Sequence, residues 1–234
     1  MQSYNAVTTQ KNHRSKLERN RSISGLLFAL PWIIGFLAFS LYPICISMYY
    51  SMTDFNIFKK PKWVGFGNYT DLFHDPKFYK SLWNTLYMVA LATPISIIAA
   101  LLLAVLLNQK VKGRPLFRTF FYLPSIVPTV ASSLLWLWLL NPQAGLINGI
   151  LKALGLYQPN WLMDPKFTKP SLIIMAVWGV GNMMIIFLAS LQDVSRSQYE
   201  ASEIDGANSI QRFFHITLPG ISPVIFFQLI MSII

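Results

Sequence analysis

One polar segment gathers four of the nine acidic side chains of a chain whose formal net charge is +10. These acids are Asp193, Glu200, Glu203 and Asp205. Ser197 and Glu200 have the spacing of a helix capping box, and Gly206 stands where that helix would end in a left-handed residue. Asn208 and Gln211 repeat the box and predict a second short helix. Carboxylates on such a projection suit ion pairing with basic residues of a partner protein.

The end of this segment carries two proline signals. Leu218 precedes Pro219, and helical backbone is disfavoured for a residue that precedes proline. Ser222 followed by Pro223 has the pattern of an N-cap and a first helical residue. We therefore predict that residues 193–219 form two short helices joined by a turn, called the knob below, and that a separate membrane helix begins near Pro223.

Two other residues are candidates for a substrate path. Asn182 lies in an apolar stretch, where polar side chains usually face the interior of a helix bundle, either toward a solute or toward a neighbouring helix. Trp136 has the ring to stack on a sugar, although an anchoring role at the membrane surface explains it as well. His13, His74 and His215 lie in different segments and Cys45 is the single cysteine, so we expect neither a metal site nor a cofactor.

The elements that must position these residues are apolar and long. Only 12% of the residues are charged, against about 25% in ordinary globular domains. Five stretches contain no charge: 22–53, 81–109, 119–151, 170–192 and 218–234. The first four each meet the roughly 20 residues that a helix needs to cross a bilayer. Because lipid satisfies no backbone hydrogen bond, we predict an all-α fold, a polytopic transmembrane helical bundle.

We expect membrane helices at about 23–50, 82–107, 119–140 and 171–191, kinked by the prolines within them. A fifth would start near Pro223 and continue past residue 234, with a sixth after it. Between the third and fourth helices, apolar residues at helical spacing predict a short amphipathic helix over 146–154, with Gly155 as its cap and Trp161 at the membrane surface.

The basic residues indicate the orientation of the chain. Two clusters flank the first and third helices: Lys11, Arg14, Lys16, Arg19 and Arg21, then Lys110, Lys112, Arg114 and Arg118. The positive-inside rule places both clusters in the cytoplasm, which explains the net charge better than nucleic-acid binding does. Residues 1–22 would then be a cytoplasmic basic tail, the knob would be cytoplasmic, and segments 54–80 and 152–169 would face outward. Five lysines in segment 54–80 are an exception to the rule.

The knob carries a motif that resembles a known family. Glu200, Ala201 and Ser202 are followed by Asp205, Gly206 and Ala207, and then by an Ile-Thr-Leu-Pro run that ends in Leu218 and Pro219. This pattern resembles the EAA loop of the permease subunits of binding-protein-dependent ABC importers, with Ser202 in place of the second alanine. The similarity extends over about 26–234 and includes Asn68 with Tyr69, the entry to the third helix, and residues 145–149.

The resemblance implies a transport subunit and its partners. The loop would dock into a cytoplasmic ATP-binding subunit and transmit its closure, while a second permease and an extracytoplasmic solute-binding protein complete the importer in the cell membrane. The chain has no G-x-x-x-x-G-K-[ST] pattern, so ATP would be bound by the partner and we expect no enzyme activity. The aromatic-rich first helix and residues 64–69 resemble the maltose and oligosaccharide group. Permeases for amino acids, phosphonate or polyamines, and less so a channel, are the alternatives.

Overall fold

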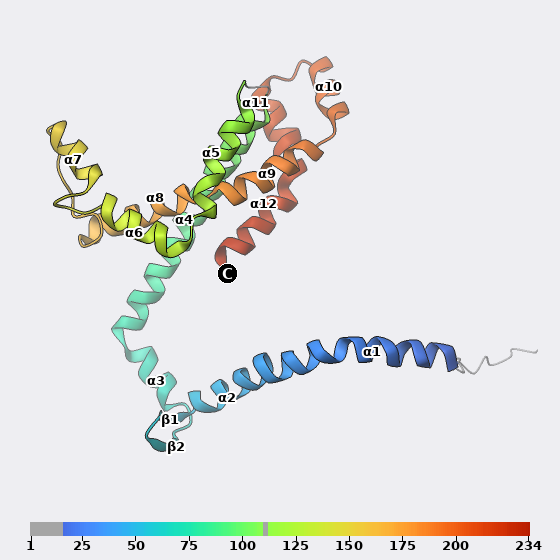
Figure 1. Cartoon of the computed structure of the whole chain (residues 1–234), viewed down its shortest axis with the longest axis vertical. Helices are drawn as coiled ribbons and strands as arrows, with labels where there is room; N and C mark the ends of the chain where they lie inside the picture. Colours follow the sequence, from blue (N-terminus) through green and yellow to red (C-terminus); the bar gives the residue numbers. More distant parts are fainter. Residues whose placement is uncertain (1–15, 110–111) are drawn as a thin grey trace, which may run out of the picture. The chain divides into compact units, whose positions relative to one another are not determined.

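The computed structural model describes residues 16–109 and 112–234, which form mainly helices (Figure 1). The chain divides into two compact units, one up to Phe78 and one from Tyr79 to Ile234. Each unit is described by itself.

The first unit begins with one long apolar helical run. It comprises α1 (Lys16–Phe36), a π-helical turn η1 (Leu37–Leu41) and α2 (Tyr42–Ser51). Residues Ile23–Ser51 are long and apolar enough to cross a membrane, which confirms the first expected span. Residues 16–20, which belong to the predicted basic tail, are already helical. Residues 1–15 of the predicted tail lie outside the described residues.

A small hairpin follows, which the sequence did not predict. Strands β1 (Thr53–Asn56) and β2 (Lys59–Trp63) pair antiparallel, and α3 (Gly67–His74) comes next. Asn68 of α3 holds this helix against the end of α2 and the start of β1, because its Nδ2 donates to the carbonyl oxygens of Ser51 and Thr53, each at 2.9 Å. The hydroxyl of Tyr69 donates to Ser51 Oγ at 2.7 Å. The Asn68 and Tyr69 pair therefore has a clear structural role.

The second unit is built on three apolar helices. These are α4 (Pro76–Asn108), whose first residues precede the unit boundary, α9 (Gly181–Asp193) and α12 (Leu218–Ile233). Their buried side chains form one core, which includes Ala100, Ala104, Met184, Phe187 and Ile221, all with 0% exposure. The alanines of α4 allow a close approach of the neighbouring helices, as small residues do in membrane proteins.

Two expected membrane helices are each divided into a bent pair. The expected helix 119–140 consists of α5 (Arg114–Ile126) and α6 (Thr129–Leu139), which meet at 97°. Val127 between them is extended, with φ −65° and ψ 130°, because it precedes Pro128. The expected helix 171–191 consists of α8 (Pro165–Trp178) and α9, which meet at 49° around Gly179 and Val180. The bend at Pro128 confirms the predicted proline kink, although it is sharp, whereas the bend at Gly179 and Val180 was not predicted.

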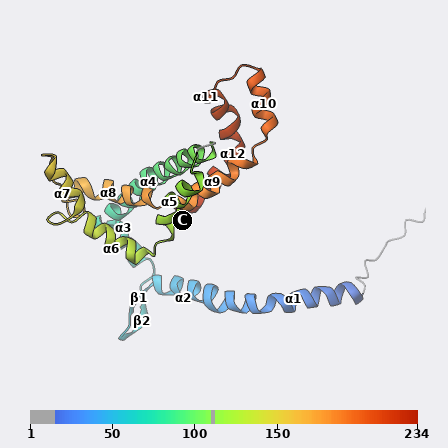
Figure 2. The same cartoon turned by 45° about the horizontal axis from the view of Figure 1, so that its top comes forward.

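The remaining elements lie at the two ends of this unit (Figures 1 and 2). The amphipathic helix α7 (Leu146–Ala153) is at one end, as predicted, and Gly155 follows it with φ +69°. At the other end lies the knob, with α10 (Arg196–Ile204) and α11 (Ser209–Arg212). Within the described residues, three helices pass the length and apolarity test for a membrane span, or five spans if each bent pair counts as one.

Candidate functional site

The first helix of the knob begins earlier than the sequence indicated. Its N-cap is Ser195, which makes no side-chain capping bond, and Ser197 lies inside the helix. The predicted capping box of Ser197 and Glu200 is therefore wrong. The hydroxyl of Ser197 instead lies 2.7 Å from the hydroxyl of Ser195. Glu200 is exposed one turn further along and forms no ion pair within the described residues, so its carboxylate is available to a partner.

The end of this helix is the predicted left-handed glycine. Gly206 has φ +77°. Its N–H donates to the carbonyl oxygen of Glu203 at 3.1 Å, and the N–H of Ala207 donates to that of Ser202 at 2.9 Å. This is the Schellman arrangement, which satisfies carbonyl groups that the end of a helix would leave unpaired. The motif residues Ser202, Gly206 and Ala207 therefore build the turn itself.

The second helix of the knob starts with the predicted capping box. Gln211 N–H donates to Asn208 Oδ1 at 2.9 Å, and Asn208 N–H donates to Gln211 Oε1 at 2.8 Å. Two backbone donors that a helix start would leave unpaired are thus satisfied.

The predicted break between the knob and the last membrane helix is absent. Helix α11 runs through a π-helical turn η2 (Phe213–Thr217) directly into α12. In the π turn Leu218 N–H bonds to the carbonyl of Phe213, and Pro219 occupies the first turn of α12. Because the helix is continuous here, Pro219 removes one backbone donor from the run, and the π turn directly before it accommodates this loss. Pro223 lies within α12, and the hydroxyl of Ser222 bonds back to the carbonyl of Pro219 at 2.8 Å.

Side-chain contacts fasten the two knob helices together. Arg212 of α11 forms an ion pair with Glu203 of α10. The hydroxyl of Tyr199 lies 2.7 Å from the hydroxyl of Thr217, which is buried in the π turn. Because these contacts join α10 to α11 and η2, the knob is a braced structure rather than a flexible connection.

The knob also presents apolar side chains that the sequence motif does not include. Ile204 has 87% of its surface exposed, Ile210 has 70% and Phe214 has 56%. A hollow of about 440 Å³ lies beside the turn, lined by Ser202, Asp205, Gly206, Ala207, Gln211, Arg212, His215 and Ile216. Apolar side chains exposed among carboxylates on one projection are typical of a surface that binds another protein. Ile204 and Ile210 could not be identified as surface residues from the sequence, because isolated isoleucines in short helices usually belong to a core.

A second candidate site is a polar cavity among the apolar helices. Its volume is about 410 Å³, and its polar lining comes from Thr93 and Ser96 of α4, Asn182 of α9, and Gln228 and Ser232 of α12. Asn182 is thus placed beside a cavity, as expected of a residue on a substrate path. Gln228 has only 6% of its surface exposed, and its Nε2 has no hydrogen-bond partner among the described residues. Gln228 was not predicted as a site residue. The last membrane helix was expected to begin near Pro223, only five residues before Gln228.

Trp136 does not line this cavity. Its ring packs edge-on against Trp178, with ring centroids 5.8 Å apart, and 8% of its surface is exposed. The structure therefore does not bring Trp136 and Asn182 into one site, and a role for Trp136 in substrate passage stays a prediction.

The end of the unit opposite the knob is held by Asn148 of α7. Its Oδ1 accepts a hydrogen bond from Trp161 Nε1 at 2.8 Å, and its Nδ2 donates to the carbonyls of Pro142 and Pro159. Asn148 has 3% of its surface exposed. Trp161 thus has a packing role in this loop besides the surface role expected for it.

Comparison with known proteins gives one consistent result. The family model described as "Binding-protein-dependent transport system inner membrane component" matches residues 64–234. The chain is 40% identical over 224 residues to the probable ABC transporter permease protein YesP of Bacillus subtilis, covering 94% of this chain and 72% of that one. It is 39% identical over 226 residues to the lactose transport system permease protein LacF of Rhizobium radiobacter, covering 94% and 75%.

Solved structures agree with these relatives. A bacterial ABC transporter involved in the import of the acidic polysaccharide alginate matches with a TM-score of 0.79 and 30% identity, covering 92% of this chain and 74% of that one. A structure of a bacterial alginate ABC transporter in complex with an alginate pentasaccharide-bound periplasmic protein matches with a TM-score of 0.76 and 28% identity, covering 90% and 70%.

Proposed function

Because the chain belongs to the family of binding-protein-dependent transport system inner membrane components, we propose that it carries a sugar or oligosaccharide across the cell membrane as one permease subunit of an ABC importer. A solute-binding protein would deliver the solute from outside. ATP-binding subunits in the cytoplasm would drive the movement, with a second permease completing the path. The N-terminus and the knob would then lie inside, and Asn160 outside.

One observation carries this proposal: a single helical run joins the knob to the polar cavity. Residues Ser209–Ile233 are continuous and include both α11 of the knob and the cavity residues Gln228 and Ser232. A partner that moves the knob therefore moves one wall of the cavity. Rigid secondary-structure elements shared by two sites are one of the physical routes by which coupling is carried between them.

The knob has the features of a docking element for an ATP-binding subunit. Glu200 and Asp205 are exposed carboxylates, while Ile204 and Ile210 are exposed apolar side chains. Such a combination fits a basic-rimmed groove with an apolar floor on the partner, with charges setting the register and apolar contacts supplying affinity. Because the chain lacks a phosphate-binding P-loop pattern, hydrolysis of ATP would belong to that partner.

The cavity lining favours a neutral, hydroxyl-rich solute. Its polar side chains are hydroxyls and amides, and no charged residue lines it. Hydroxyl and amide groups both donate and accept hydrogen bonds, as the hydroxyls of a sugar require. An amino acid, a phosphonate or a polyamine carries charge, and a charge inside a membrane protein is usually paired.

The test is reconstitution of the chain with its co-purified partners in vesicles. ATP hydrolysis is measured with the binding protein and, in turn, neutral oligosaccharides, amino acids, phosphonates and polyamines. We expect stimulation by an oligosaccharide. Stimulation by a charged solute alone would contradict the proposed substrate class, and solute passage without ATP would indicate a channel.

A further inference from the structure

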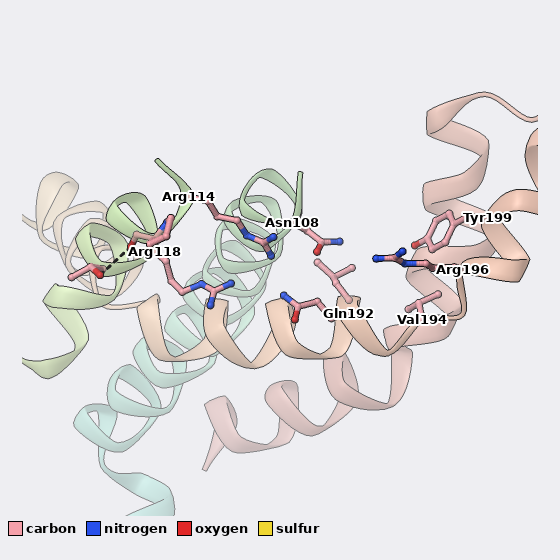
Figure 3. A pocket seen from close by; sticks show the side chains of 10 residues that line it. Asn108, Arg114, Arg118, Gln192, Val194, Arg196 and Tyr199 are labelled. Carbon is pink, nitrogen blue, oxygen red and sulfur yellow. Dashed lines mark hydrogen bonds between the residues drawn. The ribbon is translucent and has the colours of Figure 1, made fainter. Parts of the chain in front are cut away.

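A large cavity of about 830 Å³ lies beside the base of the knob and is lined by three arginines. Arg114 and Arg118 come from the first turns of α5, and Arg196 comes from the start of α10. In Figure 3 the guanidinium groups from α5 and the guanidinium group of Arg196 point toward the cavity from opposite sides, with Asn108 and Gln192 between them. No acidic side chain lines the cavity.

These arginines have no counter-charge in the described part of the chain. The ion pair found there, between Arg212 and Glu203, involves none of them. The Nε atoms of Arg114 and Arg118 are buried and have no hydrogen-bond partner among the described residues. A buried donor without a partner is costly, and more so when it is charged. The half-buried side chains of Arg114 and Arg118 therefore lack an acceptor, and the cavity beside them has room for one.

The position of Arg114 and Arg118 at the start of α5 adds to the uncompensated positive charge of the cavity. They lie in the first and second turns of a 13-residue helix whose N-cap residue is Gly113, which has no side chain to cap it. A helix N-terminus carries partial positive charge, so arginines there are unfavourable unless an anion lies nearby. The general preference for basic residues on the cytoplasmic side explains their presence in the segment but not their convergence on one cavity with Arg196.

The cavity lies where three apolar stretches end. Asn108 lies one residue before the end of the charge-free stretch 81–109, Thr119 opens 119–151, and Gln192 closes 170–192. If these stretches span the hydrocarbon, the floor of the cavity lies where the helices leave it, which is close to the depth of phospholipid phosphate groups. Basic pockets between membrane helices at this depth bind anionic headgroups.

We propose that this cavity binds a phosphate group, held by Arg114, Arg118 and Arg196 and supplied by the headgroup of an anionic phospholipid or by free phosphate. Arginine suits this role because its planar donors match phosphate oxygens in pairs. Tyr199 lines the same cavity and also contacts the π turn through Thr217. A bound phosphate would therefore lie against the residue that braces the knob. This site is separate from the solute path and does not depend on which solute is carried.

The test uses the full chain purified with its partners in nanodiscs of phosphatidylcholine, with or without phosphatidylglycerol. Phospholipid retained after detergent extraction is measured by mass spectrometry, and thermal unfolding is measured with and without inorganic phosphate. The variants are Arg118→Gln, Arg196→Gln and the triple change of Arg114, Arg118 and Arg196 to glutamine. Arg196 is exposed, so its variant keeps the test valid if substitutions in α5 impair folding. The matched control changes Lys59, Lys60 and Lys62 of the hairpin to glutamine and removes the same charge elsewhere.

Each single arginine change should lower phosphatidylglycerol retention about tenfold, whereas the lysine control should not. If inorganic phosphate alone stabilises the wild type and not the arginine variants, the site holds free phosphate. If only phosphatidylglycerol does so, the site holds a lipid headgroup. Equal retention and equal phosphate response in wild type and arginine variants would overturn the proposal. So would a lysine control that loses as much lipid as the arginine variants.

Discussion

The hydroxyl groups of Tyr199 and Thr217 lie 2.7 Å apart and join the first helix of the knob to the π turn at the base of α12. Thr217 is buried, and the bond is partly buried. A force applied to α10 therefore reaches α12 through a side-chain bond as well as through the turn at Gly206.

We predict that Tyr199→Phe weakens coupling and leaves ATPase attachment intact. Loss of one neutral hydrogen bond costs about 1 kcal/mol, and the aromatic ring remains to pack. The measurement is the ratio of solute moved to ATP hydrolysed. A double-mutant cycle with Thr217→Val isolates the pair, since the second change should add little once the first is made. Tyr122→Phe is the control, because the Tyr122 hydroxyl makes no hydrogen bond among the described residues. An unchanged ratio in Tyr199→Phe would exclude this link.

We predict that Gly206→Val reaches the membrane in normal amounts but loses transport. No atom lies within 4 Å of a Cβ placed on Gly206, so the cost is the left-handed backbone alone, about 1 to 2 kcal/mol. Uptake and ATPase co-purification are measured together. Gly155→Val is the matched control, because Gly155 also has a left-handed φ and open space around it but ends α7 at the far end of the unit. Gly206→Asn should be milder, since asparagine tolerates this conformation. Normal transport by Gly206→Val with its ATPase attached would show that the knob is not the coupling element.

The capping box of Asn208 gives a third prediction. Asn208→Ala removes the acceptor for Gln211 N–H and should destabilise α11 by about 1 kcal/mol, with reduced ATPase co-purification. Asn208→Asp keeps an acceptor and should retain attachment. Equal loss in both variants would indicate that the amide contacts the partner rather than capping the helix.

Gly181 is a point of close approach between α9 and α5. A Cβ there would lie 2.5 Å from the carbonyl oxygen of Phe121 and 2.8 Å from Tyr122 Cα, both backbone atoms. We predict that Gly181→Ala forces the helices apart and lowers the amount of folded protein, at a cost of about 1 to 3 kcal/mol. Gly179→Ala, two residues away, meets only Ala176 O at 3.6 Å and should be tolerated. The check is the thermal unfolding temperature of each variant in detergent. Equal unfolding temperatures would contradict this packing.

The orientation is tested by cysteine labelling. In a chain whose Cys45 is changed to alanine, a cysteine placed at the exposed Asn160 should react with a membrane-impermeant reagent applied from outside. A cysteine at Ile204 on the knob should react only after the membrane is opened. The reverse pattern would invert the topology and exclude docking of the knob on a cytoplasmic subunit.

Local sequence patterns predicted the parts of the fold that local physics determines. Charge-free stretches located the apolar helices, and the Gly206 and Asn208 signals located the turn and the second helix of the knob. The outcome at two prolines was not predicted, because tertiary structure adds choices that a single stretch does not reveal. Pro128 ended a helix with a 97° bend, whereas Pro219 was accommodated after a π turn without a break. Proline removes the same donor in both cases, and only the neighbouring turns decide the outcome.

The cavities were beyond sequence reasoning for a similar reason. Asn182 stood out because it is polar within an apolar stretch, but Gln228, Thr93 and Ser96 become a set only when α4, α9 and α12 pack together. Arg114, Arg118 and Arg196 likewise read as basic residues of two separate loops. Their convergence is a property of the packed helices.

The unbroken run from Ser209 to Ile233 has a mechanical consequence. Its 25 residues span about 37 Å at 1.5 Å per residue. If its knob end is held while the run tilts by about 10°, its other end moves by about 6 Å, slightly more than the pitch of one helical turn. The helix thus acts as a lever arm, and a small rotation imposed outside the membrane becomes a displacement large enough to change which side chains face one another within it.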